Sequence, residues 1–259
     1  MRSVKRIVRA IFQPNHWLTF FKSFLIIGTP IQFLGRYIFN TGSYPWCTSI
    51  RTPVGKQVVE LQRFEDIFTI TEIFLWEVYR SNVDVRNFVD IGGNVGFASL
   101  YFLTRSNDSR GFLVEPLSQN MGRAKKTLSK FGDRIECITA AVSSEDGTLE
   151  IGVEPTGRYS GVDCLETGIR QTFASIGINT LLDQVSEKLG IIDVVKIDCE
   201  GAEQQFMPVI SQVNLMHVSR FVIESRPLND GNLVKAGFQK KIVFDDEAGG
   251  YVLEYRRDQ

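Results

Sequence analysis

The sequence predicts an α/β fold in which a mostly parallel sheet carries helices on both faces and ends in an antiparallel hairpin. Three observations indicate it. Short apolar segments alternate with segments of helical pattern from residue 87 to 236, the order that builds parallel sheets. The segment 191–198 (IIDVVKID) has the strongest buried-strand pattern in the chain. Two strand-like segments joined by a glycine-containing turn then close the sequence.

Composition limits the class of protein. The 259 residues are 43% hydrophobic and 23% charged, which is ordinary for a globular chain of one domain with a short appendage. The net charge of −1 argues against nucleic acid as the main partner. Only two histidines occur, which argues against a His-rich metal site. The four cysteines are scattered without a C-x-x-C spacing, so we expect a reducing, cytoplasmic location.

Residues 1–50 predict a basic amphipathic helical arm that precedes the main domain at 51–259. Residues 1–59 hold eight Lys or Arg and no Asp or Glu. A membrane span needs about 20 apolar residues, whereas the apolar run from residue 17 is interrupted by Lys22 and ends at Gly28 and Pro30. One interpretation is peripheral contact of residues 1–40 with an anionic membrane surface. The other is a helical cap that packs its apolar side on the domain.

The first half of the main domain begins with loops. Residues 41–62 contain several Gly and Pro and predict loops that lead into a strand at 58–61. Residues 69–80 (TITEIFLWEVYR) predict a helix, because the apolar residues share a broad face and a threonine can cap it. Strands at 87–91, 111–115 and 134–139 then alternate with helices at 95–104 and from 118, and a strand at 148–153 is expected to extend the sheet edge.

The second half continues the alternation after a long connection. Residues 154–175 combine Gly and Pro with few apolar runs and predict a long loop, which we expect to cover the face of the domain that holds the active site. The later elements are a helix from 179, the strand 191–198, a helix from 202, a strand at 217–224, a helix at 228–236 and the hairpin strands 238–244 and 251–255.

A glycine-rich turn joins the first strand of the alternation to its helix. It reads Asp90-Ile-Gly92-Gly-Asn94-Val-Gly96, and glycines there let the backbone approach a ligand closely. Open parallel sheets bind ligands at the carboxyl ends of their strands. The spacing differs from the dinucleotide Gly-x-Gly-x-x-Gly and from phosphate-binding loops. An acid at the head of this turn would repel a pyrophosphate and favour a cationic ligand.

The next strand ends in Glu115, 19 residues beyond Gly96. In this architecture, an acid at that place accepts hydrogen bonds from ribose hydroxyls. A nucleoside pocket with acids and no phosphate clamp suits S-adenosylmethionine, which carries a sulfonium, an amino acid and an adenosine. We therefore predict that Asp90, Gly92, Asn94, Gly96 and Glu115 bind this cofactor. The alternative is an ordinary tight turn with a surface glutamate.

The motifs VDIGGNVGFASLYF, FLVEP, VVKIDCEGAE and FVIES resemble the FkbM family of S-adenosylmethionine-dependent methyltransferases, over about Thr52 to Glu224. The resemblance implies the class I methyltransferase fold, a Rossmann-like seven-stranded sheet whose last two strands form the C-terminal hairpin. It also implies O-methylation of a sugar, glycan or secondary-metabolite hydroxyl without a metal. Arg226 stands where the family often has a His, so proton removal would need another group.

An acidic cluster follows the strand 191–198. Asp198, Glu200 and Glu203 lie where this strand ends and a helix begins. Crowded carboxylates make one another harder to ionise, which suits a general base within about 2.6–3.2 Å of a hydroxyl. We predict Asp198 as the base or the group that orients the acceptor, and Glu200 as a weaker candidate. Helix capping alone explains Glu203, and a divalent cation is the alternative for the cluster, although no further ligands show a clear spacing.

The remaining candidates are single residues. Glu72 is predicted to reach the amino group of the cofactor's methionine portion, or else to be a solvated helix residue. Residues 141–143 are predicted to border the adenine, with Ser143 in contact. Lys196 is expected to pair an acid at its strand end, and Cys199 to pack as a small hydrophobe.

Three functions fit these observations. The first is the O-methyltransferase; the others are a nucleotide-dependent reductase of related fold and a non-catalytic binding domain that recruits partners through the basic arm. No Tyr-x-x-x-Lys pair supports the reductase. The sequence does not encode the acceptor or the oligomeric state.

Overall fold

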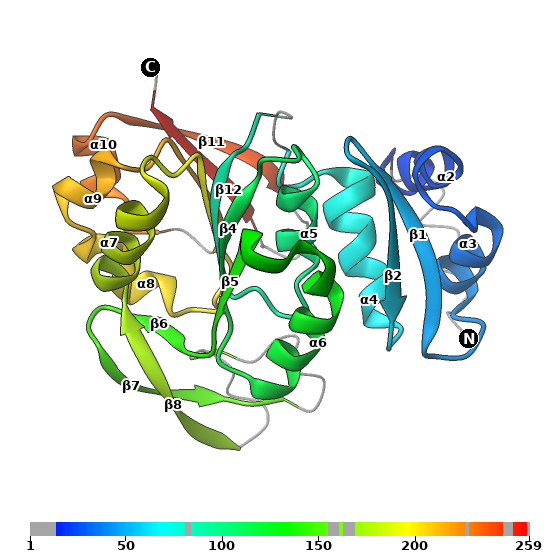
Figure 1. The fold of residues 1–259 in the computed structure, drawn as a ribbon, viewed down its shortest axis with the longest axis horizontal. Helices are drawn as coiled ribbons and strands as arrows, with labels where there is room; N and C mark the ends of the chain where they lie inside the picture. The colour runs from blue at the N-terminus through cyan, green and yellow to red at the C-terminus, as the bar shows by residue number, and fades with distance from the viewer. Residues whose placement is uncertain are drawn as a thin grey trace. The chain divides into compact units, whose positions relative to one another are not determined.

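The computed structural model describes residues 14–80, 84–154, 161–162, 169–225, 228–245 and 251–257 (Figure 1). Its chain forms two compact units. The first comprises residues 1–83 and 104–107, and the second residues 84–103 and 108–259. The predicted boundary at residue 50 therefore falls inside the first unit. Arg226 lies outside the described residues.

The first unit contains helices around a short hairpin. Its elements are α2 (Pro14–Ile26), α3 (Pro30–Phe39), β1 (Trp46–Thr52), β2 (Gly55–Leu61), α4 (Glu65–Ile70) and the π-helix η1 (Thr71–Trp76). The helices expected in the arm are thus present. Strand β1 was expected as a loop, but it pairs antiparallel with β2 along its whole length, with Trp46 opposite Leu61. In the described ranges, no helix has the length and apolarity needed to cross a bilayer.

The helix predicted at 69–80 differs from the observed one at both ends. It begins at Glu65, and the Asp66 carboxylate in its first turn accepts hydrogen bonds from the backbone N–H groups of Gln62 and Arg63 at 2.7 and 3.2 Å, which fixes the chain just ahead of the helix. It ends at Trp76, because Glu77 adopts a left-handed conformation with φ of 55°. A threonine cap at 69 or 71 is therefore wrong.

The second unit is built on a seven-stranded sheet (Figure 1). Its order is β11-β12-β10-β9-β3-β4-β5. The bounds are β3 Asn87–Ile91, β4 Arg110–Val114, β5 Ile135–Ile138, β9 Val194–Ile197, β10 Arg220–Ser225, β11 Phe238–Asp245 and β12 Tyr251–Arg257. The strands from β10 to β5 are parallel, whereas β12 runs antiparallel to both β10 and β11. The predicted mostly parallel sheet with a C-terminal antiparallel hairpin is confirmed.

The strand order places a switch point at the centre of this sheet. From β3 the chain builds outward through β4 and β5, and then returns to β9 on the other side of β3. Loops that leave the carboxyl ends of β3 and β9 therefore diverge, and the crevice between them is where such sheets bind ligands.

Helices cover the sheet and bury its apolar strands. They are α5 (Phe97–Leu103), α6 (Ser118–Leu128), the 3₁₀ turn η2 (Ser129–Arg134), α7 (Ile178–Leu189), α8 (Glu203–Phe206), the 3₁₀ turn η3 (Met207–Val209), α9 (Gln212–Met216) and α10 (Gly231–Lys235). Every residue of α5 is buried. Leu181, Leu182 and Val185 of α7 belong to the same core cluster as Val89 and Val195 of the sheet. Strands covered on both faces are mostly apolar, which is why the sequence pattern predicts them clearly.

A separate three-stranded sheet corrects two expectations. It has the order β6-β8-β7, with β6 at Ala141–Ser143, β7 at Gly147–Gly152 and β8 at Arg170–Gly177. The segment expected to extend the main sheet, 148–153, instead lies in β7. The C-terminal part of the expected loop 154–175 is strand β8, because it pairs antiparallel with β7 from Gly147 opposite Ser175 to Gly152 opposite Arg170.

Candidate functional site

The turn after β3 is held closely against its neighbours. Gly92 and Gly96 have φ values of 72° and 84°, and Asn94 shares this left-handed region at 48°. A Cβ on Gly92 would collide with the backbone carbonyl of Asp198. The glycines are therefore required by the approach of the turn to β9 and by its dihedral angles.

Backbone hydrogen bonds fix the same turn to two strand ends. The N–H groups of Gly92 and Gly93 both donate to the carbonyl of Val114, at 2.9 and 3.0 Å. The N–H of Asp198 donates to the carbonyl of Ile91 at 3.1 Å. The ends of β3, β4 and β9 are thereby joined into one rigid edge.

A buried ion pair lies directly beneath this edge. Asp90 and Lys196 are register partners on β3 and β9, and their side chains are 0% and 3% exposed. Lys196 Nζ lies 3.2 Å from Asp90 Oδ1 and 3.6 Å from Asp198 Oδ2. The ammonium also donates to the Gly92 carbonyl at 2.8 Å, and Ser99 Oγ donates to Asp90 Oδ2 at 2.7 Å. The expectation that Lys196 pairs an acid at its strand end is confirmed.

This pairing keeps Lys196 charged. Burial acts to lower the pKa of the ammonium, but the carboxylates of Asp90 and Asp198 outweigh it and raise the pKa above its ordinary value. A positive charge is thus fixed below the turn and bonded to its backbone at Gly92. Asp90 acts on the turn through Lys196, and it is not among the residues that line the cavity described next.

A cavity opens at the carboxyl ends of β3, β4 and β9. It holds about 580 Å³ of empty space, a volume that includes the part open to solvent. Its polar lining includes Asn94 and three acids, Glu115, Asp198 and Glu200. The described lining residues include no Lys or Arg. Its apolar wall consists of residues such as Ala140, Ala141, Val142, Leu149, Ile151 and Val162.

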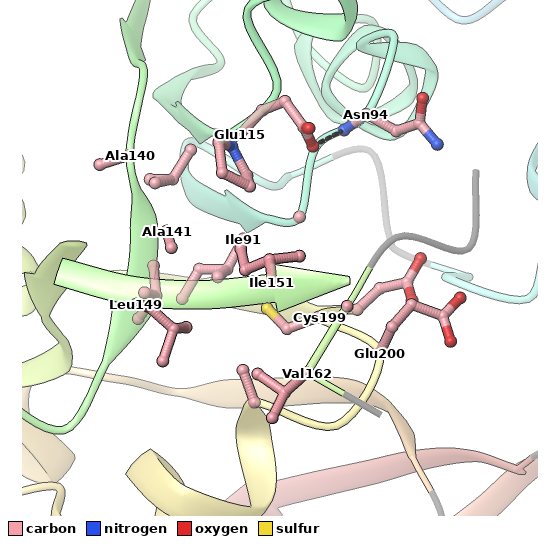
Figure 2. Close-up of a pocket in the computed structure, with 17 residues that line it drawn as sticks. Ile91, Asn94, Glu115, Ala140, Ala141, Leu149, Ile151, Val162, Cys199 and Glu200 are labelled. Atoms are coloured by element: carbon pink, nitrogen blue, oxygen red, sulfur yellow. Dashed lines mark hydrogen bonds between the residues drawn. The ribbon is translucent and has the colours of Figure 1, made fainter. Parts of the chain in front are cut away.

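Glu115 is the most buried acid of the cavity, with 5% of its surface exposed. Its Oε2 accepts a hydrogen bond from the N–H of Asn94 at 2.9 Å. Its Oε1 accepts from the N–H of Leu117 at 3.0 Å and from Asn120 Nδ2 at 3.3 Å. Burial raises the pKa of Glu115, and these hydrogen bonds oppose the rise. Figure 2 shows Glu115 and Asn94 joined by their hydrogen bond, across the hollow from Leu149 and Val162.

The acidic cluster after β9 divides into two roles. Asp198 and Glu200 line the cavity, and the Asp198 side chain is 31% exposed. Glu203, the first residue of α8, instead accepts hydrogen bonds from Gly201 N–H at 3.0 Å and from Ser225 Oγ at 2.8 Å, so it holds the turn that leads into the helix and does not line the cavity. Within the described ranges, no group of three or more His, Cys, Asp or Glu is placed to hold a metal ion.

The cavity brings together five of the residues predicted from the sequence. They are Gly92, Asn94, Glu115, Asp198 and Glu200. Three other candidates of this unit, Asp90, Gly96 and Ser143, do not line it. A Cβ on Gly96 would press on Ala124 of α6, and Ser143 Oγ donates to the Glu145 carbonyl. Glu72 lies half-buried on η1, in the other unit, so its contact with the cofactor stays a prediction.

The apolar wall is the part that sequence reasoning missed. Leu149 and Ile151 come from β7, and Val162 from the short described stretch 161–162. The sequence predicts a strand at 148–153 on the edge of the main sheet, but not that this strand belongs to another sheet and lines a cavity. Cys199 also lines the cavity, where burial raises the pKa of its thiol well above the ordinary value, in keeping with its expected role as a small hydrophobe.

Comparison with known proteins gives distant similarities. No family model matches the chain. The chain is 24% identical over 232 residues to the AMB antimetabolite synthetase AmbE of Pseudomonas aeruginosa; the match covers 74% of this chain and 11% of that protein. The chain thus spans about a tenth of the length of this curated relative.

Among solved structures, similar ones include two methyltransferases and a protein in complex with S-adenosylhomocysteine. The magnesium protoporphyrin IX methyltransferase of Synechocystis, solved with bound S-adenosylmethionine, is 13% identical, with 74% of this chain and 79% of that chain covered and a TM-score of 0.41. The TrmK protein of M. capricolum, in complex with S-adenosylhomocysteine, is 12% identical over 71% and 67%, at 0.38. The precorrin-6y C5,15-methyltransferase of Geobacter metallireducens is 13% identical over 70% and 85%, at 0.40. The fold assignment rests on the strand order itself.

Proposed function

We propose that this chain is an S-adenosylmethionine-dependent methyltransferase of the FkbM type. Its acceptor is a hydroxyl oxygen of a sugar, glycan or secondary metabolite. The observation that carries the proposal is the cavity at the switch point, whose described lining holds three acids and no Lys or Arg. Such a lining attracts a positively charged methyl donor and repels a diphosphate. It therefore disfavours the reductase, which would bind a dinucleotide.

The residues of the cavity fit this cofactor. A carboxylate offers about four acceptor positions, and three donors already occupy Glu115, which leaves capacity for a ribose hydroxyl. Ala140, Ala141 and Val142 offer an apolar surface for the adenine ring. Asp198 and Glu200 carry the negative charge that suits the donor's cationic portion. When bound, the cofactor supplies an electrophilic methyl group.

Asp198 is the proposed base or orienting group for the acceptor hydroxyl. Its side chain is partly exposed in the cavity, and Lys196 Nζ, 3.6 Å from Oδ2, fixes its position. The acceptor oxygen must lie in line with the transferable carbon, and such positioning is worth up to about 7–11 kcal/mol in well-oriented systems. The placement of Asp198 on a rigid strand end serves this requirement.

We expect Glu115→Gln to weaken S-adenosylhomocysteine binding tenfold or more, about 1.4 kcal/mol. A glutamine places an NH₂ group against the backbone N–H of Asn94 or Leu117, where the carboxylate now accepts from both. Isothermal titration calorimetry measures the effect. A separate titration with NADPH tests the alternative, a reductase that binds a dinucleotide. Glu136→Gln on β5 is the matched control, because its carboxylate forms an exposed pair with Lys188. Absence of heat and of a thermal shift with either form of the cofactor would overturn the proposal.

The raised pKa of Glu115 predicts a pH dependence of binding. Only the ionised carboxylate accepts hydrogen bonds at all of its positions. An ordinary glutamate has a pKa of about 4.3, and burial raises the pKa of Glu115 above its ordinary value. As the pH is lowered, the affinity for S-adenosylhomocysteine is therefore expected to fall before the pH reaches that ordinary value. Titrations from neutral to acidic pH in the parent and in Glu115→Gln measure it. A parallel decline in both proteins would show that another group is responsible.

A further inference from the structure

The outer face of α2 carries large apolar side chains in exposed positions. The exposed residues of this face are Trp17, Leu18, Phe20, Phe21, Phe24 and Leu25. Phe21 and Leu25 are 62% and 66% exposed. Helix α3, which contacts α2, adds Ile31 at 77% and Phe39 at 58%. Contiguous exposed apolar surface of this kind marks an interaction site.

The opposite face of α2 is occupied in large part by small polar residues. Thr19 and Ser23 are fully buried. Thr19 Oγ1 accepts a hydrogen bond from Trp76 Nε1 at 2.7 Å, and Ser23 Oγ donates to the carbonyl of Phe20 at 2.8 Å. A helix that only caps a domain buries its apolar stripe and exposes its polar one. In α2 much of this arrangement is reversed. We therefore expect the exposed aromatic face to be covered by another apolar surface.

The net charge of the unit indicates what kind of surface covers this face. The unit that contains α2 has eleven Lys or Arg and five Asp or Glu, a net charge of +6, whereas the other unit carries −7. A second copy docked on this face would bring two strongly positive units together. A negatively charged surface instead compensates them, and exposed Trp and Phe are the residues that bury in the headgroup region of a bilayer.

We propose that the outer face of α2 binds an anionic lipid membrane surface. The 13 residues of α2 are too few to span the hydrocarbon core, which needs about 20, so the helix lies in the plane of the interface. Its aromatic side chains enter the headgroup region, and the basic residues of the unit contact lipid phosphates and carboxylates. This inference does not depend on the cofactor or on the reaction proposed above.

Sedimentation with lipid vesicles tests the proposal. We expect the full chain to bind phosphatidylcholine vesicles that contain phosphatidylserine, and to bind pure phosphatidylcholine vesicles at least tenfold more weakly. Raising the salt concentration is expected to weaken the binding, because it screens the exposed charges. The triple variant Phe21→Ser/Phe24→Ser/Leu25→Ser should lose at least tenfold in partitioning.

A matched control keeps the result specific. Val213 and Met216 on α9 of the other unit are exposed to a similar extent, 58% and 61%. Val213→Ser/Met216→Ser is expected to bind vesicles like the parent. Equal binding to neutral and anionic vesicles, or equal loss in both variants, would overturn the proposal. So would a concentration-dependent dimer that the triple variant abolishes, since the occupant would then be a second copy of the chain.

Discussion

Lys196→Met is expected to lower the free energy of unfolding of the sheet-containing unit by about 3–5 kcal/mol, the range for removing one partner of a buried ion pair. Methionine matches much of the aliphatic stem, so little packing is lost. The variant leaves the Asp90 carboxylate fully buried, with the hydrogen bond from Ser99 Oγ to Oδ2 at 2.7 Å still in place. It also removes the donor to the Gly92 carbonyl. The turn that forms the cavity edge is then no longer fixed from below.

Hydrogen exchange of peptides from β3, β9 and β10, followed at increasing urea concentration, measures the free energy of unfolding of this unit separately from the other unit. Lys188→Met is the matched control, because Lys188 and Glu136 form a pair at 2.6 Å with both side chains about half exposed. Such surface pairs contribute about 0–1 kcal/mol. The double variant Asp90→Asn/Lys196→Met should recover part of the loss, since it removes both charges. A loss no greater than that of Lys188→Met would show that the pair does not stabilise the unit.

The stabilisation by Lys196 has a defined pH range. The pKa of this ammonium is raised in the folded state, since the Asp90 and Asp198 carboxylates outweigh burial. Its contribution is therefore fully present below the unfolded value of about 10.4 and is lost only as pH rises through the higher folded value. Between neutral pH and about pH 9, the difference between the parent and Lys196→Met should consequently stay constant.

The main sheet could be predicted because its strands are buried on both faces. Such strands are mostly apolar, and in Val194–Ile197 all four residues are buried, with Lys196 as the one charged member. Strands β1 and β8 were missed for the opposite reason. The residues of β1 (WCTSIRT) are mostly polar, and it is pairing with β2 along its whole length that makes them a strand. For β8 the partner β7 is distant in sequence, so no short turn signals the hairpin.

The site shows what residue types alone can predict. Acids at the carboxyl ends of parallel strands lie at the same edge of the sheet, and Glu115 after β4 and Asp198 after β9, on either side of β3, line one cavity there. The sequence could not show which acid faces the cavity. Asp90 is the register partner of Lys196, and partners on adjacent strands point to the same face. That pairing directs Asp90 into the interior, while Asp198, two residues beyond Lys196, reaches both the ammonium and the cavity.

Asp198→Asn is expected to lower the rate of methyl transfer by about 10²–10⁴-fold, the usual contribution of general acid–base catalysis. The carboxamide keeps the size of the side chain and the backbone bond from Asp198 N–H to Ile91, so the turn stays in place. It loses the capacity to take a proton from the acceptor hydroxyl. Single-turnover reactions with labelled S-adenosylmethionine, and with an acceptor identified by mass spectrometry of the product, measure this rate without the contribution of product release.

Two comparisons separate catalysis from binding and structure. S-adenosylhomocysteine should bind Asp198→Asn within about threefold of the parent, less than 1 kcal/mol, because Glu115 and the turn are unchanged. Glu200→Gln, on the same wall of the cavity, should have a smaller effect on the rate. If Asp198 acts as the base, the parent rate rises with pH and the variant rate does not follow it. Equal rates for the parent and Asp198→Asn at every pH would show that Asp198 has no catalytic role. Methyl transfer would then depend on positioning alone, which is sufficient for an acceptor hydroxyl that ionises readily.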